Sequence, residues 1–137
     1  MTTPYPPAHL DTSVIVRYLT NDPPSMAAAA ARLINSDRPL IVSALTLAES
    51  AYVLASVYGV PRDAIVDALS AFIQRRNIRL HHLTKPLALD ALHLCRGSNR
   101  HSFADALLWA EARTDAGTIY TFDGRFPNTN LDVLKPE

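Results

Sequence analysis

Short apolar runs alternate with longer segments of helical periodicity, and this alternation constrains the fold more than any other feature of the chain. The run Leu40-Ile41-Val42 is bounded by polar residues and is too short for a helix, so it predicts a buried strand. Strands separated by helices indicate a parallel sheet. We therefore predict an α/β fold with a short central parallel sheet covered by helices on both faces. The other predicted strands are 8–10, 78–82, 118–122 and 131–134, and the predicted helices are 12–19, 26–34, 44–58, 61–75, 84–96 and 102–115.

The length and composition fit one domain. The chain has 137 residues, of which 48% are hydrophobic, which is enough to build a core without disulfides. It contains no repeat and no Gly/Ser-rich linker, so we predict a single domain over residues 1–137, with an irregular Pro-rich extension at 1–7. Thirteen basic residues balance thirteen acidic ones, so a contact with nucleic acid would depend on local charge.

Neither a membrane span nor a disulfide is expected. The longest stretch free of charged residues lies between Glu49 and Arg62 and is far shorter than the ~20 residues that cross a bilayer. The N-terminus has no basic and apolar signal segment, so we expect a cytoplasmic protein. Cys95 is the only cysteine, which excludes an intrachain disulfide and a multi-thiolate zinc site, and we expect it to be buried.

Acidic residues stand where an α/β fold places its chemistry. Asp11 and Asp123 each follow a predicted strand, and ligands of parallel sheets bind outside the carboxyl ends of the strands. Glu49 is the only charge between Leu40 and Pro61, on a predicted helix where a carboxylate is costly without a partner. Asp105 lies in the first turn of another helix, with no Lys or Arg in its own segment.

These four carboxylates predict a metal site. Carboxylates brought together repel one another and need a positive charge, which the neighbouring sequence does not provide. Ligation by oxygen alone favours Mg²⁺ or Mn²⁺ over Zn²⁺. Such ions act on phosphates by lowering the pKa of a water and by neutralising charge on the leaving oxygen. We therefore expect phosphoryl chemistry.

Four ordered segments resemble the acidic motifs of PIN-domain ribonucleases, in particular the VapC-type toxins of type II toxin-antitoxin systems. No single motif is specific, but the set covers nearly the whole chain in the order of the family. The segments are Leu10-Asp-Thr-Ser-Val-Ile-Val-Arg-Tyr-Leu19, Leu47-Ala-Glu-Ser50, Phe103-Ala-Asp-Ala-Leu107 and Thr121-Phe-Asp-Gly-Arg-Phe126.

The resemblance implies a function and a set of site residues. By this similarity the protein cleaves RNA as an endoribonuclease that depends on Mg²⁺ or Mn²⁺, forms a homodimer and is inhibited by a small cognate antitoxin. Two segments, Met26–Ile34 and Ala51–Val60, carry more apolar residues than one helix face needs, which agrees with a partner. The implied catalytic and metal-binding residues are Asp11, Glu49, Asp105 and Asp123, and the implied supporting polar residues are Thr12 and Thr121.

Each acidic residue except Glu49 also has a purely structural interpretation. Asp11 could be a helix N-cap, Asp105 could stabilise a helix start beside Ser102, and Asp123-Gly124 could form a turn. A cap can also bind a metal, so these interpretations do not exclude the site. Two other functions stay open: a non-catalytic PIN-like binding module, and a different Mg²⁺-dependent phosphoryl enzyme on a similar sheet.

Two further sets of residues, one of arginines and one of histidines, are considered as candidate binding residues. Arg75, Arg76 and Arg79 could contact RNA phosphates, although basic residues at a helix end are also favoured by the helix dipole. His81 and His82 are adjacent in a predicted strand and would point to opposite faces, so we do not expect them to bind a metal together.

Overall fold

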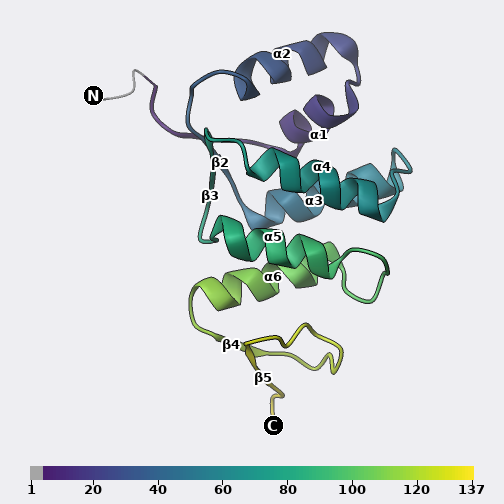
Figure 1. The fold of residues 1–137 in the computed structure, drawn as a ribbon, viewed down its shortest axis with the longest axis vertical. Helices are drawn as coiled ribbons and strands as arrows, with labels where there is room; N and C mark the ends of the chain where they lie inside the picture. Colours follow the sequence, from purple (N-terminus) through teal and green to yellow (C-terminus); the bar gives the residue numbers. More distant parts are fainter. Residues whose placement is uncertain (1–4) are drawn as a thin grey trace.

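The computed structural model describes residues 5–137, which form six helices and five short strands (Figure 1). Nearly every predicted element is present within one or two residues of its predicted ends. The elements are β1 (Ala8–His9), α1 (Thr12–Thr20), α2 (Pro24–Ile34), β2 (Leu40–Val42), α3 (Ala44–Ser56), α4 (Arg62–Ile73), β3 (Ile78–Leu80), α5 (Lys85–Leu94), α6 (Phe103–Thr114), β4 (Thr118–Tyr120) and β5 (Asp132–Leu134).

The strands form two small parallel sheets. The first has the order β1-β2-β3, with Leu40 of β2 paired to Ala8 on one side and to Ile78 on the other. The second pairs β4 with β5. Figure 1 shows β4 and β5 beyond α6, at the opposite end of the molecule from α1 and α2. The predicted α/β class and parallel pairing are confirmed, but the strands are divided between two sheets where one was expected.

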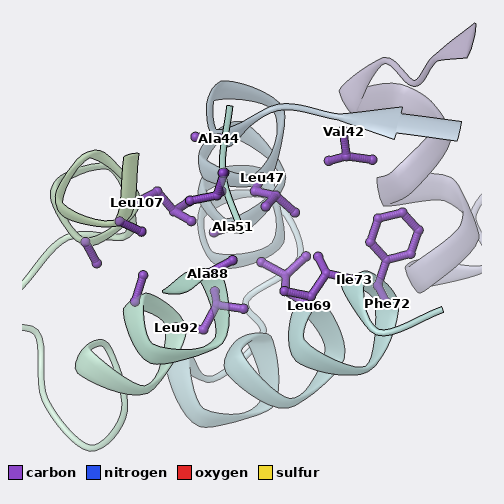
Figure 2. Close-up of a cluster of buried hydrophobic side chains, with 14 of the residues drawn as sticks. Val42, Ala44, Leu47, Ala51, Leu69, Phe72, Ile73, Ala88, Leu92 and Leu107 are labelled. Atoms are coloured by element: carbon purple, nitrogen blue, oxygen red, sulfur yellow. The ribbon is translucent and has the colours of Figure 1, made fainter. Parts of the chain in front are cut away.

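Helix α3 lies at the centre of the core. It packs against α1, α4 and α6, and α5 packs against α4 and α6. Figure 2 shows Leu47 of α3, Leu69 of α4 and Leu92 of α5 converging below β2, and all three side chains are fully buried. Burial of apolar side chains throughout this core, at about 25 cal/mol per Å² of apolar surface, is the main contribution that favours folding. The core therefore fixes α3 relative to both α1 and α6.

The two faces of the first sheet are unequally covered. Leu40, Val42 and Ile78 point to one face and are buried in the core. Side chains alternate along a strand, and on the other face His9 and Arg79 are exposed. Helices thus cover this second face less completely than the sequence led us to expect.

Polar side chains begin four of the helices. Asp11, Ser43, Thr84 and Ser102 each accept a hydrogen bond from a backbone N–H of the first helical turn. Such N-caps stabilise a helix by ~1 kcal/mol each. The cap that the sequence left open for Asp11 is present, and Ser102 caps the helix start that the sequence placed beside it.

The strand predicted over 78–82 is shorter than expected. It ends at Leu80, because His82 has a left-handed backbone with φ of 55° and cannot continue the strand. The turn at His82 directs Leu83 into the core, where it is 6% exposed. The left-handed backbone at His82 could not be predicted from the spacing of hydrophobic residues in the sequence.

The remaining predictions concern the ends of the chain, the membrane and Cys95. Residues 5–7 of the predicted extension form neither helix nor strand, and residues 1–4 lie outside the described part. No helix within residues 5–137 is long and apolar enough to cross a membrane. Cys95 is buried as predicted, and this burial raises the pKa of its thiol to about 11. The division into one domain stays a prediction.

Candidate active site

Asp11 stands at the carboxyl end of β1 as the N-cap of α1. Its Oδ2 accepts hydrogen bonds from the hydroxyl of Ser13 at 2.7 Å and from the Ser13 backbone N–H at 3.4 Å. These bonds favour the charged form, so they lower the pKa of the exposed Asp11 carboxyl below its ordinary value. Asp11 therefore presents a negative charge to solvent at neutral pH.

Glu49 is joined to the first acidic motif by Thr12. The Thr12 hydroxyl donates a hydrogen bond to Glu49 Oε2 at 3.3 Å, across the contact between α1 and α3. Glu49 itself is exposed, so its position on an apolar helix carries less desolvation cost than the sequence suggested. The motifs that contain Asp11 and Glu49 are thus neighbours in space although they are far apart in the chain.

Asp105 lies in the first turn of α6, and α6 packs against α3. Its backbone N–H donates to the Ser102 hydroxyl at 3.0 Å. Its half-buried side chain forms no hydrogen bond or ion pair with any residue of the described chain. The carboxylate is therefore free for a ligand, with favourable electrostatics from the positive end of the helix dipole.

Asp123 follows β4 and forms a turn. Its backbone N–H donates to the Thr121 hydroxyl at 3.0 Å, and its Oδ1 accepts the backbone N–H of Arg125 at 2.9 Å. The structural role that the sequence left open is therefore present. The β4–β5 unit that carries this turn lies at the far end of the molecule from α1 (Figure 1).

The four carboxylates do not form one cluster in this structure. Within residues 5–137, no group of three or more His, Cys, Asp or Glu side chains is close enough to hold a metal ion. The one ion pair among these residues joins Arg96 to Asp67 and involves none of the four. The donor set is made of carboxylate oxygens without a cationic partner, so its chemistry fits Mg²⁺ or Mn²⁺. The assignment of the four as ligands stays a prediction.

The three arginines proposed for RNA contact differ in their surroundings. Arg75 is half-buried and donates to Asn35 Oδ1 at 2.7 Å, so it connects α4 to the end of α2. Arg76 and Arg79 are exposed. Arg76 precedes β3, at the edge of the sheet opposite Asp11, whereas Arg79 lies within β3 on the poorly covered face.

Helix α4 fixes the loop before Asp105, a role that the sequence reasoning missed. Arg62 Nη1 donates to the carbonyls of Cys95 and His101 at 3.1 and 3.0 Å, and its guanidinium lies 5.0 Å from the centre of the Phe103 ring. Asp63 accepts the backbone N–H of Gly97 at 2.8 Å. One signal was available, since the dipole disfavours a cation such as Arg62 in the first turn of a helix.

The prediction that His81 and His82 point to opposite faces is wrong. Their ring centres lie 3.9 Å apart, because the strand ends before them and His82 has a left-handed backbone. The His9 ring, from β1, lies 5.4 Å from the His81 ring. Three imidazoles from two distant parts of the chain therefore meet at the carboxyl edge of the first sheet.

Comparison with known proteins identifies the family. The PIN domain family model matches residues 8–131, which includes all four acidic motifs. The chain belongs to the PIN domain family. Among solved structures, this PIN domain is similar to VapC20 of Mycobacterium tuberculosis, which is described as a toxin that cleaves the sarcin-ricin loop. The two are 26% identical, the match covers 94% of this chain and 99% of the other, and the TM-score is 0.44. No curated protein matches the sequence.

Proposed function

We propose that this PIN domain is a metal-dependent endoribonuclease and acts in the cytoplasm as the toxin of a toxin-antitoxin pair. The observation that carries the proposal is a set of carboxylates, in a PIN domain, that have no cationic partner among the described residues. The contact from Thr12 to Glu49 joins the first two motifs, and the unpaired Asp105 carboxylate lies on a helix packed against α3.

The proposed ligands of a divalent ion are Asp11, Glu49, Asp105 and Asp123. When bound, Mg²⁺ or Mn²⁺ would lower the pKa of an attacking water and neutralise charge on the leaving oxygen. The chain supports these ligands through its own residues. The Ser13 hydroxyl donates to Asp11 and the Thr12 hydroxyl donates to Glu49, while the Thr121 hydroxyl accepts the backbone N–H of Asp123.

Family membership and the carboxylates favour this function over the two alternatives. A non-catalytic PIN-like module has no need for unpaired carboxylates, of which Asp105 is half-buried. Another phosphoryl enzyme would be expected to hold the phosphate with a lysine at the carboxyl edge of the first sheet. Lys85 instead starts α5 and donates to the Arg75 carbonyl at 2.9 Å, and Lys135 follows β5 in the separate second sheet. A metal titration separates the first alternative from a nuclease.

The test is cleavage of single-stranded RNA by the purified chain. We expect cleavage with Mg²⁺ or Mn²⁺, loss of cleavage with a chelator, and products with a 5′-phosphate and a 3′-hydroxyl. Asp11→Asn and Asp105→Asn should abolish activity, because the amide keeps the volume but not the charge. Asp115→Asn is the matched control, since Asp115 is an exposed carboxylate at the other end of α6. Specific cleavage in excess EDTA would refute the proposal.

Two further variants test the remaining ligands. Glu49→Gln is expected to lower activity as much as Asp11→Asn or slightly less. Asp123→Asn is expected to lower activity too, although an Asn side chain can still accept the Arg125 N–H and keep the turn. If Asp123→Asn cleaves RNA at the wild-type rate, Asp123 is a turn residue and not a ligand.

The proposed partners are a second copy of the chain and an antitoxin. Both apolar segments predicted from the sequence expose large side chains, with exposed fractions of 53% for Met26, 72% for Tyr52 and 69% for Val57. A hollow of about 460 Å³ between α1 and α2 is lined by residues that include Val14, Met26 and Leu33. An Arg from the antitoxin could enter the carboxylate site and supply the missing charge. The candidate antitoxin to test is the product of the reading frame immediately upstream of this gene. A strictly monomeric protein whose activity is unchanged by that product would refute both partners.

A further inference from the structure

The three imidazoles of His9, His81 and His82 have no structural task in the described chain. Each of these side chains is exposed, and the His81 ring contacts the rings of His9 and His82. None of the three side chains forms a hydrogen bond or ion pair with residues 5–137. Histidines that serve a fold are usually hydrogen-bonded to it through a ring nitrogen. Here the ring N–H groups are available to a ligand, and all three side chains remain exposed although the His81 ring lies against the other two.

Parallel pairing through β2 brings the three rings together. His9 is aligned with Ile41, and Ile41 is aligned with Arg79, so His9 and Arg79 share the open face of the sheet. The His81 backbone N–H donates to the Val42 carbonyl at 3.0 Å, which continues the ladder one residue beyond β3. The left-handed backbone of His82 then places its ring beside His81.

This histidine surface adjoins the acidic site. His9 lies two residues before Asp11, at the carboxyl end of the same strand. A carboxylate site repels the phosphates of its own substrate, so a nuclease needs donors and cations nearby. The chain has no net positive charge to meet this need, and the exposed Arg79 is a cation on the same open face.

We propose that His9, His81, His82 and Arg79 form the surface on which a single strand of RNA binds as it approaches Asp11. Imidazole rings stack on unpaired bases and donate hydrogen bonds to phosphate oxygens, and Arg79 supplies a fixed positive charge. The inference rests on the proposed function only in that RNA is the substrate. The surface includes Arg79 of the three arginines considered above and excludes Arg75, which is bonded to Asn35.

The test measures binding apart from cleavage. In an Asp105→Asn background, the affinity for a fluorescent single-stranded RNA is measured by anisotropy, for the parent and for the combined variant His9→Ala, His81→Ala, His82→Gly. Glycine is used at residue 82 because the left-handed backbone disfavours alanine. His93→Ala is the matched control, since His93 is an exposed histidine on α5.

We expect the combined variant to bind the RNA with a Kd raised by about tenfold or more. Loss of a single base–aromatic stacking contact weakens affinity by at least about fivefold, and more than one ring is removed. His81→Ala alone should account for much of this loss, because its ring contacts both others. Arg79→Gln should reduce the slope of log Kd against log salt by about 1. Circular dichroism spectra that match the parent would show that the fold is kept.

Equal affinity of the combined variant and the His93→Ala control would overturn the inference, even if the protein cleaves RNA as proposed. Conversely, a histidine-dependent affinity in a protein that shows no metal-dependent cleavage would support the RNA surface and refute the proposed reaction. The two proposals can therefore fail separately.

Discussion

Replacement of Arg62 by methionine is expected to loosen the loop that leads into α6. The half-buried guanidinium donates two hydrogen bonds to loop carbonyls, at 3.1 and 3.0 Å, and lies over the Phe103 ring. Each bond contributes about 1 kcal/mol and the ring contact about 0.5 kcal/mol, so we expect Arg62→Met to lower the free energy of unfolding by about 2.5 kcal/mol. For a domain of this size the melting temperature should fall by about 10 °C.

The assay for Arg62→Met is urea unfolding followed by circular dichroism. Arg113→Met is the matched control, because the Arg113 guanidinium lies 5.6 Å from the Trp109 ring centre and forms no hydrogen bond within the described chain. The Arg113→Met substitution should lower the free energy of unfolding by no more than about 1 kcal/mol. If Arg62→Met destabilises the protein no more than Arg113→Met does, the two carbonyl contacts do not hold the loop.

Two further predictions follow from pKa shifts. Ser13→Ala removes the hydroxyl that lowers the pKa of Asp11, so an NMR titration should show that pKa move up toward its ordinary value. The Ser13 bond stabilises the folded protein at pH values above the ordinary carboxyl pKa, and this stabilisation should be lost as the pH falls through the lowered pKa of Asp11. An Asp11 pKa that is the same in Ser13→Ala and in the wild type would contradict the prediction. Burial raises the pKa of Cys95 to about 11, so only about one thousandth of the thiol is ionised at pH 8. Cys95 should therefore react with a thiol reagent only after unfolding, and fast labelling of the native protein would show that it is accessible.

Much of the fold could be predicted because local signals decide it. Ser102 marks the start of α6 through its cap, and the apolar run Leu40–Val42 is buried as β2. The end of β3 could not be predicted, since it depends on the left-handed backbone of His82. The separation of β4 and β5 from the first sheet depends on long-range pairing, which strands of three residues specify weakly.

The candidate site was predictable as a set of residue types but not as an arrangement. Unpaired carboxylates such as Asp105 can be found from their apolar neighbours, and Asp11 from its place after a strand. The bond from Thr12 to Glu49 joins segments 37 residues apart and follows from the packing of α1 on α3. The histidine surface could not be predicted, because it requires both the strand order and the turn at His82.

The central claim is that the proposed carboxylates, with Asp11, Glu49 and Asp105 among them, belong to one site for a divalent cation. Its most direct test is isothermal titration of the purified chain with Mn²⁺, without RNA, for the wild type and for Asp11→Asn, Glu49→Gln, Asp105→Asn and the control Asp115→Asn. We predict saturable binding by the wild type and the control, and weaker binding by at least about tenfold in each of the other three variants. Wild-type affinity in Asp105→Asn would contradict the claim.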